Sequence, residues 1–124
     1  MTPLRVLLVE DNETYRETLA FLLRGHDELE IVGEVATGAE AASASAEQGP
    51  DVAVIDLRLP DMGGMEAAAG IRERSPATAI VFLSASAGAE EQRAAASSGR
   101  QLVRKDEGID TLVAAIHASG QGAA

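Results

Sequence analysis

Short runs of apolar residues alternate along the chain with longer segments in which apolar positions recur at three- and four-residue steps. The apolar runs predict strands at Leu4–Val9, Ile31–Ala36, Val52–Ile55, Ala79–Leu83 and Leu102–Val103. Consecutive apolar positions, as in the third and fourth runs, are typical of strands buried on both faces. The longer segments predict helices at Glu13–Arg24, Gly38–Gln48, Gly64–Arg74, Ala89–Ser98 and Gly108–Ala118.

This alternation of strands and helices predicts a single α/β domain. Parallel strands need crossover connections, and helices that make them cover both faces of the sheet. We therefore expect a five-stranded parallel sheet, doubly wound as (βα)5 in the flavodoxin-like manner. The domain should span residues 1–118, and the Gly- and Ala-rich residues 119–124 should form a flexible tail or a linker stub.

The charge balance limits the classes of partner. The chain has 20 acidic and 10 basic residues, a formal net charge of −10, and this surface repels nucleic acid phosphates. We expect no direct binding to nucleic acid. Cysteine is absent, and no apolar run approaches the roughly 20 residues of a membrane span, so we also expect a cytoplasmic protein without membrane association.

Acidic residues stand where two of the predicted strands end. Glu10 and Asp11 follow the first strand and Asp56 follows the third, at the sheet edge where open parallel sheets bind ligands. Clustered carboxylates repel one another unless a cation lies among them. Oxygen donors without cysteine or a nearby histidine favour Mg²⁺, Mn²⁺ or Ca²⁺ over zinc. Asp11 and Asp56 could bind such an ion directly, and Glu10 could bind it through water.

A hydroxyl and an amine complete this edge. Ser84 ends the fourth predicted strand, and Lys105, the only lysine of the chain, follows the fifth. A carboxylate beside a metal ion can attack phosphorus and form an aspartyl-phosphate. The lysine and the hydroxyl could then hold phosphoryl oxygens through charge-assisted hydrogen bonds.

Four ordered motifs carry a family resemblance over about residues 4–118. They are Val9-Glu10-Asp11-Asn12, Val54-Ile55-Asp56-Leu57-Arg58-Leu59-Pro60-Asp61-Met62-Gly63-Gly64, Leu83-Ser84-Ala85 and Arg104-Lys105-Asp106. Together they resemble the motifs of response regulator receiver domains of two-component signalling. Lys105-Asp106, in place of Lys-Pro, resembles receivers that carry a LuxR-type helix-turn-helix output.

The resemblance implies a signalling switch that catalyses only its own phosphotransfer and dephosphorylation, rather than an enzyme with other substrates. Asp56 would accept a phosphoryl group from a sensor histidine kinase or a small phosphodonor in a Mg²⁺-dependent reaction, with Mn²⁺ as a substitute. Glu10, Asp11, Asp56 and the backbone carbonyl of Arg58 would hold the metal, and Lys105 would contact the phosphoryl group. An output domain or protein partner, or a homodimer, is left open.

The switch positions depart from the family pattern. The resemblance assigns the moving hydroxyl to Ser84, but Leu102 stands where receivers usually carry Tyr or Phe. This leaves an alternative: a receiver-fold binding module that acts without phosphorylation. A phosphatase of the haloacid dehalogenase kind is disfavoured by Arg58, where that class has a second aspartate. A flavin binder is disfavoured by the acidic segment after the first strand.

Overall fold

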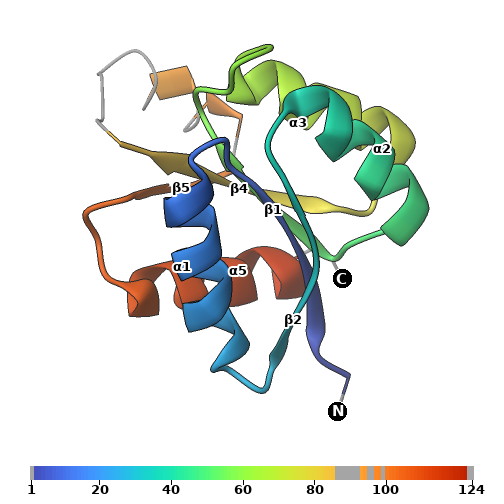
Figure 1. Ribbon diagram of the computed structural model, residues 1–124. Coiled ribbons are helices and arrows are strands. Elements are labelled where there is room, and N and C mark those ends of the chain that lie inside the picture. The colour runs from blue at the N-terminus through green and yellow to red at the C-terminus, as the bar shows by residue number, and fades with distance from the viewer. Residues whose placement is uncertain (1, 86–92, 95–96, 99, 123–124) are drawn as a thin grey trace.

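The computed structural model describes residues 2–85, 93–94, 97–98 and 100–122 (Figure 1). The elements in chain order are β1 (Leu4–Val9), α1 (Glu13–Arg24), β2 (Leu29–Val35), α2 (Gly38–Gln48), β3 (Val52–Asp56), α3 (Gly64–Arg74), β4 (Ala79–Ser84), β5 (Gln101–Arg104) and α5 (Ile109–Gly122). Most of the helix predicted at Ala89–Ser98 lies outside the described residues. Among the described helices, none has both the length and the apolar character needed to cross a membrane.

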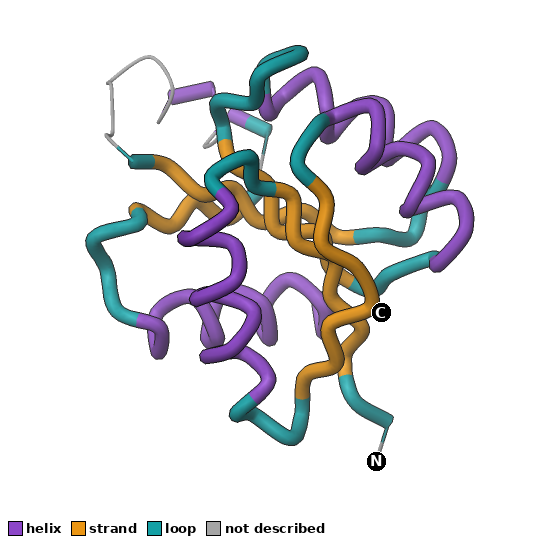
Figure 2. The backbone as a smooth tube through the Cα atoms, in the orientation of Figure 1, coloured by secondary structure: helices purple, strands orange, loops and turns teal. Residues whose placement is uncertain are grey.

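The five strands form one parallel sheet in the order β2-β1-β3-β4-β5. Helices α1 and α5 cover one face of the sheet, and α2 and α3 cover the other (Figures 1 and 2). The doubly wound fold predicted from the sequence is therefore confirmed. The chain leaves β1 for β2 on one side and later returns to place β3 on the other side, so the strand order reverses between β1 and β3.

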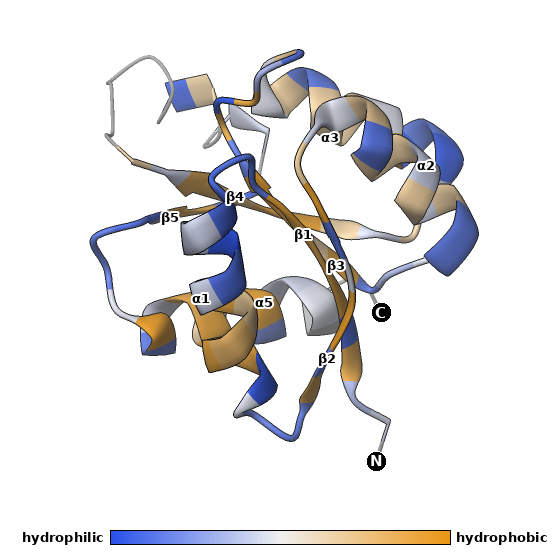
Figure 3. Cartoon of the chain, in the orientation of Figure 1, coloured by the Kyte–Doolittle hydropathy of each residue, from blue (hydrophilic) through white to orange (hydrophobic). Residues whose placement is uncertain are grey.

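A separate apolar cluster lies on each face of the sheet. Leu8, Leu23 and Ile116 belong to the cluster beneath α1 and α5, whereas Ile71 and Phe82 belong to the one beneath α2 and α3. The strands are coloured as strongly hydrophobic in the middle of the molecule in Figure 3. Every residue of β3 is buried, as its uninterrupted apolar sequence predicts.

Local capping fixes where the helices begin and end. Asn12 is the N-cap of α1, and its side chain accepts a hydrogen bond of 2.9 Å from the Tyr15 amide. Thr37 caps α2 in the same way, through the amide of Glu40 at 3.1 Å. Gly49 ends α2 with a φ of 54°, a left-handed conformation that glycine adopts without strain.

Two predicted boundaries are wrong by more than one residue. Strand β2 begins at Leu29 rather than Ile31, because Leu29 is buried and pairs in register with Leu4 of β1. Helix α5 continues beyond Ala118 to Gly122. A Cβ on Gly120 would lie 3.0 Å from the Leu4 side chain, so this last turn packs closely on the first residue of β1.

Candidate functional site

The carboxyl ends of β1, β3, β4 and β5 meet around a cavity of about 330 Å³. The cavity is lined by Glu10, Asp11, Asn12, Asp56, Leu57, Arg58, Ser84, Ala85 and Lys105. It lies at the edge of the sheet where the order reverses between β1 and β3, the position at which open α/β sheets bind ligands. The candidate residues that come from separate motifs are therefore neighbours: Glu10, Asp11, Asp56, Arg58, Ser84 and Lys105.

The three predicted carboxylates form one cluster. One carboxylate oxygen from each of Glu10, Asp11 and Asp56 lies within 4.8 Å of the other two. Glu10 and Asp56 are buried, with 1% and 6% of their surface exposed, whereas Asp11 is exposed to solvent. A set of hard oxygen donors, part buried and part open to water, fits a cation such as Mg²⁺ that retains some of its water ligands.

Lys105 balances part of this negative charge. Its Nζ donates a hydrogen bond of 2.9 Å to Oδ2 of Asp56 and forms an ion pair with Oε1 of Glu10. The ammonium also lies 4.6 Å from the centre of the Tyr15 ring, within the range of a cation–π contact. The lysine, the two buried carboxylates and the ring thus form one connected polar group.

Burial alters the acid–base properties of this group. Removal of Glu10 from water raises the pKa of its carboxyl group to about 7, although hydrogen bonds from Lys105 and from the Asn12 amide act in the opposite direction. Burial by itself would lower the pKa of Lys105, but hydrogen bonds to Glu10 and Asp56 outweigh it and the pKa is raised. The lysine therefore remains a cation, and Glu10 binds a proton more readily than an exposed glutamate does.

Backbone contacts around β3 fix the position of Asp56. The amide of Arg58 donates a hydrogen bond of 3.0 Å to Oδ1 of Asp56. Helix α3 begins so close to this strand end that a Cβ on Gly64 would lie 2.6 Å from the Asp56 carbonyl oxygen and 2.7 Å from Cα of Leu57. Two backbone segments approach each other closely at Gly64, and this approach requires a residue without a side chain.

The two predicted switch residues lie in different surroundings. Ser84 is buried in the cavity wall, and its carbonyl oxygen accepts a 2.8 Å hydrogen bond from the Lys105 amide. Leu102 is half-buried, pairs in register with Phe82 and packs on the apolar cluster beneath α2 and α3. Leu102 is not among the residues that line the cavity.

Sequence reasoning missed two contributors. The motifs do not include Tyr15, yet its ring borders Lys105 and burial raises the pKa of its hydroxyl group. Its place in the first helical turn after Glu10-Asp11 was the available signal. Asp61 accepts hydrogen bonds of 2.9 and 3.0 Å from the amides of Gly38 and Ala39, so it joins the loop after β3 to the start of α2.

Comparisons with known proteins agree with this geometry. The family model of the response regulator receiver domain matches residues 6–117, and the chain therefore belongs to this family of two-component signalling domains. A LuxR-family two-component response regulator from Aurantimonas sp. SI85-9A1 has a similar structure, with 32% sequence identity, a TM-score of 0.89, and coverage of 98% of this chain and 87% of that one.

Two curated relatives are transcriptional regulators. The uncharacterized transcriptional regulatory protein YhcZ of Bacillus subtilis is 31% identical over 111 residues, which cover 89% of this chain and 52% of the relative. The DNA-binding transcriptional activator DevR/DosR of Mycobacterium tuberculosis is 43% identical over 72 residues, 58% of this chain and 33% of the relative. The chain thus spans about half or less of the length of these relatives.

Proposed function

We propose that this receiver domain accepts a phosphoryl group on Asp56 and changes its interaction with an output domain or protein partner as a result. The observation that carries the proposal is the joining of Asp56 to Lys105 inside a cavity that also contains Glu10, Asp11 and Ser84. In the transfer, a carboxylate oxygen of Asp56 forms a bond to phosphorus, and the bond from phosphorus to the donor nitrogen or oxygen breaks.

Mg²⁺ is the metal that these donors fit best. Glu10, Asp11, Asp56 and the backbone carbonyl of Arg58 would hold it, with Glu10 contributing through water and Mn²⁺ able to replace it. When bound, the ion would neutralise the phosphoryl oxygens and reduce their repulsion by the carboxylate cluster.

The remaining residues have separate roles in the proposal. The ammonium of Lys105 donates a hydrogen bond to Asp56, and it would donate one to an oxygen of the phosphoryl group once this group is attached. The Ser84 hydroxyl, in the wall of the same cavity, would bind a second oxygen. Because the Ser84 carbonyl accepts a hydrogen bond from the Lys105 amide, movement of Ser84 would displace the backbone at the carboxyl end of β5.

The partners are inferred from the family. A sensor histidine kinase would supply the phosphoryl group, and its cytoplasmic location would be shared by this chain. The regulatory relatives make an output that acts on transcription the most economical proposal, although the acidic receiver itself is not expected to bind DNA. Helix α5 extends to Gly122, so a tail or a linker would begin beyond this helix and not at residue 119.

Intact-mass spectrometry after incubation with acetyl phosphate tests the proposal directly. We expect the mass of one phosphoryl group to be added when Mg²⁺ is present, and not when the ion is removed with EDTA. Asp56→Asn should abolish the gain, and Asp11→Asn should reduce it. Asp51→Asn is a matched control, because that aspartate accepts a hydrogen bond from the Arg5 amide and lies outside the cavity lining.

The same experiment separates the proposal from its alternative. A wild-type chain that gains no mass with Mg²⁺ and acetyl phosphate, or with a purified histidine kinase, would contradict phosphorylation. The receiver fold would then serve as a binding module independent of phosphorylation. A gain that persists in Asp56→Asn would move the acceptor to another residue.

A further inference from the structure

A second and larger cavity lies at the opposite edge of the sheet from the carboxylate cluster. It has a volume of about 470 Å³ and is formed by the end of α3, the loop before β4, the start of β5 and the end of α5. Its lining residues are Arg72, Pro76, Ala77, Thr78, Ala79, Ile80, Ser98, Arg100, Gln101, Ala118 and Ser119. The volume is in the range of cavities that bind small molecules.

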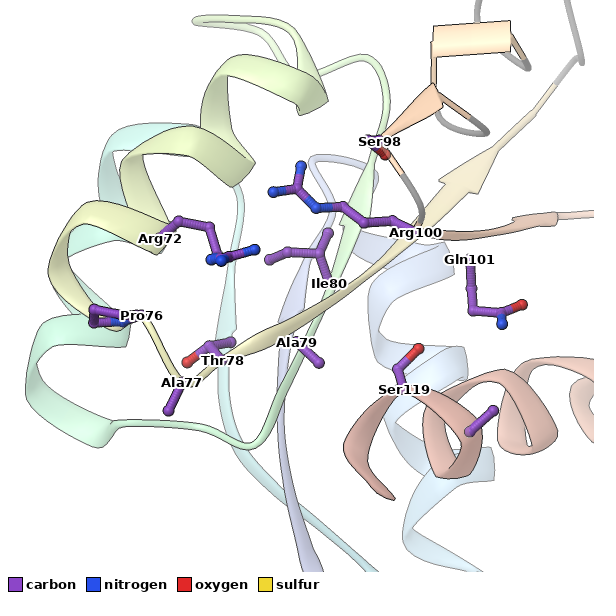
Figure 4. A pocket seen from close by; sticks show the side chains of 11 residues that line it. Arg72, Pro76, Ala77, Thr78, Ala79, Ile80, Ser98, Arg100, Gln101 and Ser119 are labelled. Carbon is purple, nitrogen blue, oxygen red and sulfur yellow. The ribbon is translucent and has the colours of Figure 1, made fainter. Parts of the chain in front are cut away.

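Two arginines dominate this cavity. Figure 4 shows the side chains of Arg72, from α3, and Arg100, next to β5, directed toward one another above Ile80. Within the described part of the chain, neither guanidinium group forms an ion pair or a hydrogen bond. Burial and the nearby charge of Arg72 lower the pKa of Arg100, so the two cations oppose each other across the space.

The charge of the lining is unusual for this chain. The protein has a formal charge of −10, yet none of the described residues that line the cavity is acidic. Two of the 10 basic residues converge there, whereas Gln101 and Ser119 line the part of the cavity next to α5 (Figure 4). Arg72 is exposed and Arg100 is half-buried, so solvent screens part of the repulsion between the two guanidinium groups, and an anion between them would remove the rest.

We infer that this cavity is a binding site for a small phosphate-bearing anion, held between Arg72 and Arg100. The planar guanidinium group presents paired N–H donors that match phosphate oxygens, and both arginines direct these donors into the same space (Figure 4). Among the described residues that line the cavity none is aromatic, so none of them would stack on a nucleobase. The ligand class is therefore a compact phosphate compound, such as pyrophosphate or a sugar phosphate, rather than a nucleotide.

The site is independent of the proposed phosphorylation. Its residues lie at the amino ends of β4 and β5, whereas Asp56 and Lys105 lie at the carboxyl end of the sheet. A bound anion would connect α3 to the segment that enters β5, because one arginine comes from each. Such a ligand could hold these two parts of the domain together whether or not Asp56 is modified.

Isothermal titration calorimetry with pyrophosphate, in EDTA and at constant ionic strength, tests the inference. We expect saturable binding of one pyrophosphate per chain. The variant Arg72→Gln/Arg100→Gln should bind about tenfold more weakly or not at all, because each charge-assisted contact contributes substantially. Arg74→Gln is the matched control: it lies on the same helix, is exposed, and does not line the cavity, so its affinity should equal that of the wild type.

Amide chemical shifts then locate the ligand. Perturbations on pyrophosphate addition should centre on Arg72 and Arg100 and be absent around Asp56 and Lys105. The inference is overturned by the absence of saturable binding, by equal affinity in the double variant, or by shifts centred on the carboxylate cluster. Tighter binding of citrate than of pyrophosphate would overturn the assignment to phosphates. Circular dichroism of the double variant would show that lost binding is not lost folding.

Discussion

The Nζ atom of Lys105 lies 2.9 Å from Oδ2 of Asp56, although 49 positions separate the two residues in the sequence. The contact forms because β3 and β5 end at the same edge of the sheet, on either side of β4. The ammonium also pairs with Glu10, so one cation neutralises part of a cluster of three carboxylates. The stability of the domain should therefore depend on the charge state of this group.

Replacement of Lys105 by methionine should destabilise the metal-free protein. The change removes the cation that is shared by Glu10 and Asp56 and leaves two buried carboxyl groups to repel each other. We expect the free energy of unfolding to fall by about 2 kcal/mol in EDTA, the scale of a hydrogen bond to a charged group. Urea denaturation followed by circular dichroism would measure it.

Added Mg²⁺ should return part of the stability lost in Lys105→Met, because the ion would supply positive charge to the same carboxylates. Arg104→Met is the control: its ion pair with Asp106 is largely exposed and should contribute no more than about 1 kcal/mol. Equal losses in the two variants, with no effect of Mg²⁺ on either, would show that Lys105 has no special electrostatic role.

The raised pKa of Glu10 predicts a pH dependence. Burial raises this pKa from 4.5 to about 7, so between these pH values the folded state binds a proton that the unfolded state has lost. The stability contributed by Glu10 is thus fully present below pH 4.5 and is lost as pH rises through about 7. Glu10→Gln, which cannot ionise, should become more stable relative to wild type by roughly 1–3 kcal/mol over that range in EDTA.

Parallel urea titrations of wild type and Glu10→Gln at a series of pH values would test this prediction. Mg²⁺ should reduce the advantage of the glutamine variant, since a bound cation favours the charged form of Glu10. A stability difference that stays constant across the series would mean that Glu10 ionises as readily in the folded chain as in the unfolded one.

A single methyl group at Gly64 should disturb the site. The Cβ of Gly64→Ala would lie 2.6 Å from the Asp56 carbonyl oxygen, and backbone atoms cannot move aside cheaply. We expect a loss of about 1–3 kcal/mol in the free energy of unfolding and slower phosphorylation by acetyl phosphate. Gly63→Ala has no atom within 4 Å of the new Cβ and should cost less than about 1 kcal/mol. Similar thermal stability in both variants would contradict the close-approach argument.

The arrangement of strands and helices could be predicted almost completely, because the central strands are short and consist mostly of apolar residues. Each strand of the sheet centre is largely a short apolar run, and α1 and α3 bury apolar residues at three- and four-residue steps. The boundaries that failed were set by tertiary contacts. Leu29 joins β2 through its pairing with Leu4, and the last turn of α5 is retained because Gly120 permits close packing on that same leucine.

The sequence predicted most of the residues of the candidate site, but it did not predict the contacts between them. The motifs placed Glu10, Asp56 and Lys105 together because each follows a strand. They did not show that Glu10 is the most buried of the three clustered carboxylates, since its burial depends on tertiary contacts such as the one with Lys105. The contact of Tyr15 with Lys105 was hidden for a different reason: an aromatic residue on an amphipathic helix is usually explained by core packing.

Asp61 should hold the start of α2 in place. This helix buries only small residues, Gly38, Ala41 and Ser45, so its apolar anchoring is weak and its N-terminal contacts carry more weight. The Asp61 carboxylate accepts hydrogen bonds from the amides of Gly38 and Ala39, which lower its pKa. Asp61→Ala should therefore reduce the hydrogen-exchange protection of amides in α2 while leaving that of α5 unchanged.

The lowered pKa also gives this contact a pH dependence. A carboxylate with a depressed pKa in the folded state contributes stability above its ordinary value of 3.8, and the contribution is lost as pH falls through the still lower folded value. The effect of Asp61→Ala should thus be full at neutral pH and fade in acid. Asp106→Ala, which removes an exposed carboxylate paired with Arg104, should leave protection in α2 unaltered. Equal loss of protection in α2 and α5 would show global destabilisation instead of the loosening of one helix.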